Sequence, residues 1–148
     1  MRVADIMATS VATVGVDEAA EAAADLMQLH RIHHLLVMSN GQLVGILSDR
    51  DIGGRRGGPL REGRTVRDLM TPNVTTIAKN ATVRRAANLM RGRTIGCLPV
   101  VNGRGRVLGI ITTSDLLELV GRGAERPVER RRRWTLKHRG LRKAPRSA

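Results

Sequence analysis

The stretch Gly45-Ile46-Leu47-Ser48-Asp49-Arg50-Asp51 returns later in the chain as Gly109-Ile110-Ile111-Thr112-Thr113-Ser114-Asp115. In each copy an apolar run, typical of a strand, ends at a hydroxyl residue, and an aspartate follows three positions later. We expect a helix to start there, which places the aspartate beside the unpaired backbone N–H groups of the first turn. Such a helix start can bind a ligand with hydroxyls or phosphates, or Ser48 and Thr112 can simply cap their helices.

The two motifs belong to a longer internal repeat. Val66-Arg67-Asp68-Leu69-Met70 matches Val3-Ala4-Asp5-Ile6-Met7 at an offset of 63 positions, and Asp115 matches Asp51 at an offset of 64. A repeat of this length predicts two β-α-β-β-α units, each too small to bury both of its faces alone. We therefore expect a mixed α/β (α+β) fold in which the two halves pack pseudo-symmetrically, with related clefts between them.

Each repeat is expected to begin with a strand and a capped helix. In the first repeat, Val11 to Val14 predicts a strand, Asp17 a helix N-cap, and Glu18 to His30 the helix itself. In the second repeat the corresponding strand is Val74 to Ile77, and Asn80 is the corresponding cap.

Glycine and asparagine mark the expected turns. Asn40-Gly41 and Asn102-Gly103-Arg104-Gly105 each separate two apolar runs, which predicts β-hairpins. The glycine-rich segment Gly53 to Gly58 lacks the lysine of a phosphate-binding loop, and we interpret it as a linker. These signals divide the chain into a first repeat with its linker (residues 1–60), a second repeat (61–121) and a basic tail (122–148).

The composition favours a small aliphatic core. Apolar residues make up 41% of the 148 residues, and the single aromatic residue is Trp134, which argues against an aromatic platform for stacking RNA bases. The single cysteine, Cys97, excludes an internal disulfide and is expected to be a small packed side chain. We find neither a signal-peptide core nor a membrane span, and we expect a soluble cytoplasmic protein.

Positive charge is concentrated at the end of the chain. Residues 1–121 hold 15 Lys/Arg against 11 Asp/Glu, whereas residues 122–148 hold 11 against 2, so +9 of the net charge of +13 lies in the tail. Such a run is usually a solvated tail. The alternative is an electrostatic arm that binds nucleic acid or an acidic protein, with Trp134 available to stack on a base.

The order of elements and several sequence words resemble the CBS domain family. These words are Val66-Arg67-Asp68-Leu69-Met70-Thr71-Pro72, Gly96-Cys97-Leu98-Pro99-Val100-Val101 and the two copies of the opening motif. The resemblance covers about residues 1–121 and implies a tandem CBS pair, or Bateman module, which commonly forms a homodimer. It also implies that adenosine-containing ligands such as AMP, ADP, ATP, S-adenosylmethionine or NAD bind in the two inter-repeat clefts.

The resemblance assigns ribose and phosphate contacts residue by residue. Asp51 and Asp115 would accept hydrogen bonds from the ribose 2′ and 3′ hydroxyls, a role that suits an acceptor-only carboxylate. Ser48 and Thr112 would bind phosphate or ribose from the adjoining helix starts. Two further residues are close enough in sequence to assist, namely Arg50 and Ser114.

In the family, the adenine lies against the segment just before the Leu-Pro-Val strand. In the second repeat this implies contacts from Ile95, Gly96, Cys97 and Pro99, together with Thr76. In the first repeat Leu36 replaces the usual proline. There, Arg31-Ile32-His33-His34-Leu35 resembles the basic stretch with which the regulatory subunit of AMP-activated kinase meets phosphates, so the implied phosphate contacts are Arg31, His33 and His34.

Two functions from different classes fit these observations. The first is a non-enzymatic regulatory module that senses an adenosine-containing ligand and passes a conformational change to a partner. The second is a dimeric scaffold whose basic tail binds nucleic acid or an acidic protein. A metal site at His30, His33 and His34 is disfavoured because no cysteine or suitable acidic third ligand accompanies them, and no catalytic motif is recognisable.

Overall fold

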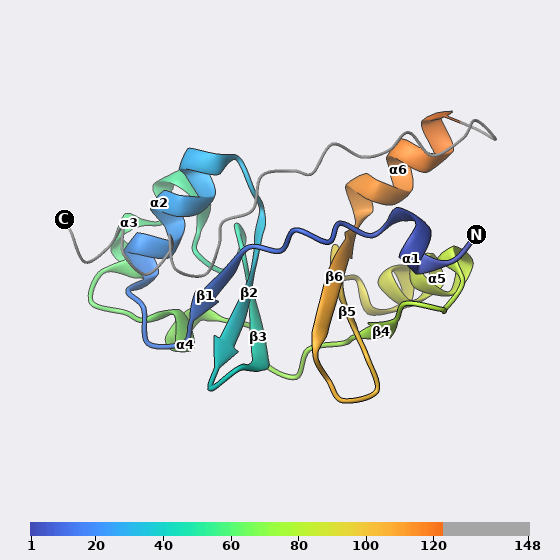
Figure 1. Ribbon diagram of the computed structural model, residues 1–148. Coiled ribbons are helices and arrows are strands. Elements are labelled where there is room, and N and C mark those ends of the chain that lie inside the picture. The colour runs from blue at the N-terminus through green and yellow to red at the C-terminus, as the bar shows by residue number, and fades with distance from the viewer. Residues whose placement is uncertain (123–148) are drawn as a thin grey trace. The chain divides into compact units, whose positions relative to one another are not determined.

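The structure is a computed structural model, and it describes residues 1–122 (Figure 1). Contacts divide the chain into two compact units, each of which contains a three-stranded sheet. The described part of the N-repeat unit consists of residues 11–74, and that of the C-repeat unit consists of residues 1–10 and 75–122. The expectations for the basic tail and Trp134 fall outside the described residues.

The N-repeat unit contains a mixed sheet and its helices. Its elements are β1 (Thr13–Gly15), α2 (Ala20–His30), β2 (His34–Ser39), β3 (Gln42–Ser48), the 3-10 helix η1 (Gly54–Arg56), α3 (Gly58–Arg61) and α4 (Val66–Leu69). β1 runs parallel to β2, and β2 pairs with β3 in antiparallel fashion. Asn40 and Gly41 join β2 to β3 with φ of 51° and 77°, the left-handed conformation that an Asn-Gly turn requires. This predicted hairpin is confirmed.

The C-repeat unit has the same strand order. Its elements are α1 (Val3–Ile6), β4 (Ile77–Ala78), α5 (Val83–Arg93), β5 (Cys97–Val101), β6 (Val107–Thr112) and α6 (Thr113–Arg122). β4 is parallel to β5, and β5 is antiparallel to β6. The structure thus confirms the predicted mixed α+β class and the two related sheets. Within residues 1–122, no helix is long and apolar enough to cross a membrane.

The first residues of the chain pack in the C-repeat unit, as Figure 1 shows for α1 beside α5. Val3 N donates to the carbonyl of Ala81 (2.8 Å), and Ala8 forms an antiparallel bridge with Ile110 of β6. Val3 and Ile6 are buried in the aliphatic core of this unit. A segment at the beginning of the chain therefore completes the fold around the second repeat.

The same arrangement occurs in the N-repeat unit, where α4 takes the place of α1. Thr71 bridges Ile46 of β3, and Val66 is buried in the core. The helix at the start of the first repeat, α1, thus packs with the sheet of the second repeat. The helix at the start of the second repeat, α4, packs with the sheet of the first repeat. The packing boundaries of the units consequently differ from the sequence boundary between residues 60 and 61.

This packing explains why both copies of the repeated motif begin with glycine. A Cβ atom at Gly109 would lie 2.6 Å from the carbonyl oxygen of Ala8, and one at Gly45 would lie 2.6 Å from the Met70 sulfur. Both distances are well below van der Waals contact. The glycines let the segments that follow α1 and α4 cross directly over β6 and β3.

Both predicted helix caps are wrong. α2 begins at Ala20, whose N–H donates to the carbonyl of Arg64 (2.9 Å), so a distant backbone group replaces the expected Asp17 cap. α5 is capped by Thr82, whose Oγ1 accepts a hydrogen bond from Arg85 N (3.1 Å), and not by Asn80.

The first strand of each sheet also differs from its prediction. β1 covers Thr13–Gly15 instead of Val11 to Val14, and β4 covers only Ile77–Ala78 instead of Val74 to Ile77. Each strand pairs with only one neighbour, β2 or β5, and the parallel register with that neighbour sets where it begins.

The expected helix start after Ser48 is wrong for the first motif and confirmed for the second. After β3 the chain makes turns, with hydrogen bonds from Ile52 N to Ser48 O (3.3 Å) and from Gly54 N to Asp49 O (3.0 Å). Gly53 and Gly54 then adopt φ of 78° and 62°, so a right-handed helix cannot continue through them from Ser48. In the second motif α6 begins directly at Thr113.

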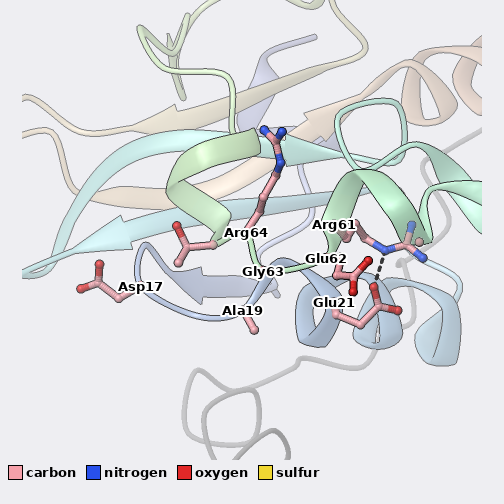
Figure 2. A pocket seen from close by; sticks show the side chains of 9 residues that line it. Asp17, Ala19, Glu21, Arg61, Glu62, Gly63 and Arg64 are labelled. Carbon is pink, nitrogen blue, oxygen red and sulfur yellow. Dashed lines mark hydrogen bonds and ion pairs between the residues drawn. The ribbon is translucent and has the colours of Figure 1, made fainter.

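The glycine-rich segment that we interpret as a linker is folded. It contains η1 and leads into α3, and Arg61 at the end of α3 is only 7% exposed. Arg61 Nη1 donates to the carbonyls of Ile52 (2.8 Å) and Gly54 (2.7 Å), while Nε donates to Glu21 Oε2 (2.8 Å). Figure 2 shows the pair formed by Arg61 and Glu21. One buried guanidinium therefore ties the segment to α2.

Replacing Arg61 with alanine is expected to lower the free energy of unfolding by about 2–3 kcal/mol, because two carbonyl groups lose their partners. Urea unfolding would measure this change. Arg64→Ala, which removes an exposed side chain from a neighbouring position, is the matched control and should stay within about 0.5 kcal/mol of the wild type. Equal effects of the two substitutions would show that the buried guanidinium contributes nothing specific.

Candidate functional site

The second copy of the motif forms a tight turn at the end of β6. Asp115 Oδ2 accepts a hydrogen bond from Thr112 N (2.8 Å), so the carboxylate folds back over the start of α6. Asp115 is only 1% exposed. Since burial of a charge is costly unless the charge is hydrogen-bonded, this aspartate is held at a fixed position by the local fold.

Thr112 presents an unsatisfied hydroxyl at the same place. Its Oγ1 is buried and has no hydrogen-bond partner among the described residues. A buried polar atom without a partner costs about 1–3 kcal/mol. A ligand that supplies a donor or acceptor here would recover that free energy.

The start of β5 lies against the same turn. The Gly96 carbonyl accepts hydrogen bonds from Thr113 N (3.0 Å) and from Thr113 Oγ1 (3.3 Å). Cys97 is the register partner of Thr112. The segment predicted to contact adenine is thus next to the residues predicted to contact ribose and phosphate.

Cys97 is a buried, neutral residue in this arrangement. Burial raises the pKa of its thiol to about 12, and the nearby Asp115 acts in the same direction. A thiol with such a pKa stays protonated at neutral pH and does not act as a nucleophile. The predicted packing role of Cys97 fits this environment.

Pro99 and Thr76 lie further along the same sheet. Pro99 is buried in β5 opposite Ile110. Thr76 is exposed and immediately precedes β4, and because Ile77 pairs with Val100 in parallel, Thr76 is level with Pro99. All of the site residues predicted in the second repeat belong to the C-repeat unit: Thr76, Ile95, Gly96, Cys97, Pro99, Thr112, Ser114 and Asp115.

The first copy of the motif closes a similar turn with different partners. Asp51 Oδ2 accepts from Ser48 N (2.9 Å), and Ser48 Oγ accepts from Asp51 N (3.3 Å). Thr71 Oγ1 also lies 3.3 Å and 3.4 Å from the two carboxylate oxygens of Asp51. Thr71 is a contact that the sequence analysis missed, although it is part of the Met-Thr-Pro word at the beginning of the second repeat.

The two histidines of the first repeat lie beside this turn. His33 Nδ1 is hydrogen-bonded to Asp49 Oδ2, and Asp49 N donates to the His33 carbonyl (3.1 Å). His34 is the register partner of Ser48. Asp49, which was not among the predicted contacts, therefore places a negative group within the segment expected to meet phosphates.

Two predicted arginines flank the histidines on exposed positions. Arg31 ends α2 in the left-handed conformation, with φ of 53°, and Arg50 is in the turn after β3.

No group of three His, Cys, Asp or Glu residues within residues 1–122 is arranged to hold a metal ion.

The environment of His34 predicts a pH-dependent stability. Burial and then the neighbouring His33 lower the pKa of His34, and they outweigh the opposite effects of Asp49 and Asp51. The unfolded chain then binds a proton more readily than the folded one. The free energy of unfolding is therefore highest, as far as His34 affects it, above about pH 6.5, and it decreases as the pH drops below that value.

His34→Gln should therefore flatten the loss of stability between about pH 7 and pH 5. Urea unfolding at several pH values would measure this slope. The C-repeat unit serves as an internal control, because its described residues contain no histidine. An identical pH slope in the variant and the wild type would contradict the prediction.

A separate open groove of about 650 Å³ lies in the N-repeat unit, around the start of α2 (Figure 2). Charged residues of both signs line it, including Asp17, Glu21, Glu62 and Arg64. None of the predicted contact residues lies in this groove.

Sequence comparisons identify the family. The profile described as CBS domain matches residues 3–52 and 66–122. A CBS domain-containing protein of Dictyostelium discoideum is 35% identical over 130 residues, with 80% of this chain and 90% of that protein covered. A homoserine O-acetyltransferase of Methanocorpusculum labreanum is 36% identical over 117 residues, but the match spans only 23% of that protein.

Solved structures agree with this result. The CBS domain pair of protein MJ0100, in complex with 5′-methylthioadenosine and S-adenosyl-L-methionine, superposes with a TM-score of 0.74 at 31% identity, over 82% of this chain and 96% of that one. The structure of CBSX2 in complex with AMP gives a TM-score of 0.70 at 26% identity, over 79% of this chain and 93% of that one. With both repeats matched by the profile and both sheets shared with solved pairs, the chain belongs to the CBS domain family.

Proposed function

We propose that the chain is a regulatory module that binds an adenosine-containing ligand and passes a conformational change to a partner. The observation that carries this proposal is the buried Asp115 carboxylate beside the unsatisfied Thr112 hydroxyl. The ligands in the two similar CBS structures, 5′-methylthioadenosine with S-adenosyl-L-methionine and AMP, support it. All three ligands contain an adenosine moiety with a ribose diol.

In the C-repeat unit, each proposed contact has a physical reason. The Asp115 carboxylate accepts hydrogen bonds from the ribose hydroxyls, and Thr112 Oγ1 gains a partner from ribose or phosphate, with Ser114 assisting. Gly96 lets the base approach the backbone because it has no side chain. The base packs against small neutral groups on the sheet and before it, with the remaining contacts from Thr76, Ile95, Cys97 and Pro99.

In the N-repeat unit, we propose a weaker site. Asp51 already accepts from Ser48 N and contacts the Thr71 hydroxyl, so a ribose diol must compete with Thr71 for the carboxylate. Asp49 also reduces the positive potential around His33. A phosphate would be bound there by the remaining cationic or polar groups, namely Arg31, Arg50, His33, His34 and Ser48.

Calorimetric titration tests the proposal with AMP, ADP, ATP, NAD, S-adenosylmethionine and 5′-methylthioadenosine. We expect a saturable heat with at least one of these ligands, and Asp51→Asn should leave the tighter event unchanged. Absence of heat with every ligand would overturn the proposed function. Ligand binding regulates a partner only when the two conformations differ in affinity, so native mass spectrometry with and without ligand should also report whether a homodimer forms and responds.

The charge of the tail supports a second candidate function. Residues 122–148 carry +9 of the net charge of +13, which favours a scaffold that binds nucleic acid or an acidic protein electrostatically. Deletion of residues 122–148 should then abolish partner binding, whereas Asp51→Asn with Asp115→Asn should not.

A further inference from the structure

The two units differ in charge even without the tail. Residues 11–74 contain 7 Lys/Arg and 8 Asp/Glu, a net charge of −1, whereas residues 1–10 and 75–122 contain 9 against 3, a net charge of +6. The three ion pairs formed among the described residues all lie in the N-repeat unit. The described part of the C-repeat unit therefore has six more positive than negative side chains.

Three segments bring this charge to one end of the β4-β5-β6 sheet. Ala78 pairs with Val101, so Lys79 is adjacent to the turn that joins β5 to β6. α5 begins at this end after Thr82, and Thr82 forms a bridge with Arg2. We call this region the cationic end, and its exposed members are Arg2, Lys79, Arg84, Arg85, Arg104 and Arg106.

Hydrogen bonds hold the backbone of the cationic end in place. Asn102 Oδ1 accepts from Arg104 N (2.9 Å) and Arg106 N (3.0 Å), and Gly105 N donates to Asn102 O (2.9 Å). Thr82 Oγ1 accepts from Arg85 N (3.1 Å). The guanidinium groups therefore extend from ordered backbone.

The charged groups of the cationic end form no ion pair with the described residues. None of its six side chains pairs with a carboxylate of the described residues, although Asp5 accepts a hydrogen bond from Arg2 N (2.7 Å). Arg84 and Arg85 lie in the first turn of α5, where the helix dipole disfavours cations. All six side chains are exposed, so their charges are available to an external anion.

The cationic end is separate from the proposed adenosine site. Gly96, Thr112 and Asp115 lie where β5 starts and β6 ends, whereas the turn Asn102–Arg106 lies where β5 ends and β6 starts. Five strand residues at about 3.3 Å each separate the two ends by about 16 Å. Occupation of one surface therefore leaves the other open.

We propose that the cationic end binds the phosphate backbone of double-stranded nucleic acid without sequence preference. Guanidinium groups match phosphate oxygens in bidentate geometry. The region has no aromatic side chain, either to stack on the bases of a single strand or to anchor a protein partner. A duplex presents a regular array of phosphates, which cationic side chains can bind without contacting the bases.

Fluorescence anisotropy with a labelled random 20-base-pair DNA duplex, from 50 to 200 mM salt, tests the proposal on the full chain. The variant Arg84→Gln/Arg85→Gln/Arg104→Gln/Arg106→Gln removes four charges from the cationic end. Since each phosphate contact contributes about 0.9 to the log-log salt slope, the slope should become shallower by about 3 to 4 and affinity at low salt should fall at least tenfold.

The matched control is Arg55→Gln/Arg56→Gln/Arg64→Gln/Arg67→Gln, which removes four exposed charges from the N-repeat unit. Both variants keep the tail, so any tail contribution is the same in the two. We expect the control to bind like the wild type apart from a small effect of net charge. Equal losses of duplex affinity in both variants, or no loss in the first variant, would overturn the proposal. It would also be overturned if polyglutamate competed for the protein as strongly as unlabelled duplex does.

Discussion

Replacing Asp115 with asparagine is expected to weaken binding of an adenosine-containing ligand roughly 10- to 100-fold, because a charge-assisted hydrogen bond is worth about 1.5–3 kcal/mol. The carboxylate accepts a hydrogen bond from Thr112 N (2.8 Å) and is 1% exposed. An amide keeps one acceptor oxygen but turns an N–H group either toward Thr112 N or toward the ribose hydroxyls. Calorimetry with the ligand that binds the wild type most tightly would measure the loss.

Asp68 offers a matched control for this substitution. Its Oδ2 accepts from Thr65 N (2.9 Å) in the same three-residue turn, and that bond is the main reason why the pKa of Asp68 is lowered. Asp68 is exposed and is not part of the proposed site. Asp68→Asn should therefore leave affinity unchanged, and wild-type affinity in a folded Asp115→Asn variant would exclude the ribose contact.

Replacing both Val3 and Ile6 with alanine is expected to lower the free energy of unfolding of the C-repeat unit by about 3–6 kcal/mol. Both side chains are almost fully buried in the core of this unit, with Leu98, Val100 and Ile111. Small domains are stable by only about 5–15 kcal/mol. Two substitutions at the start of the chain should therefore destabilise strands that are nearly one hundred residues away in sequence.

Amide hydrogen exchange would locate the effect. Protection should fall in β5 and β6 and persist in β2 and β3, because α4 and not α1 completes the N-repeat unit. Leu29→Ala is the control, since this leucine is 74% exposed on α2. Loss of protection in β2 and β3 alone would mean that the first residues pack in the N-repeat unit after all.

Much of the fold could be predicted because its signals are local. The Asn40-Gly41 turn needs two residues with positive φ, and the sequence names the two residue types best suited to it. The repeat revealed two related sheets, and the aliphatic composition predicted a core without aromatic side chains. Likewise, the turn that joins Thr112 to Asp115 involves neighbours three positions apart.

The errors concern groups whose partners are far away in sequence. Asp17 does not cap α2, because the helix begins at Ala20 and the backbone N–H of Ala20 donates to the carbonyl of the distant Arg64. The segment from Gly53 to Gly58 is folded because Arg61 forms hydrogen bonds with Ile52, Gly54 and Glu21. Thr71 was missed at the first site since its contact with Asp51 crosses 20 positions.

The sequence by itself determined the family, the two β-α-β-β-α repeats and the turn that holds Asp115, because these depend on residue type and short spacing. Only the tertiary structure decided which segment completes which sheet, why Gly109 admits no side chain, and which hydroxyl is left unsatisfied. The physical reason is that packing and hydrogen-bond satisfaction depend on atoms brought together from distant positions. No local pattern encodes which of them meet.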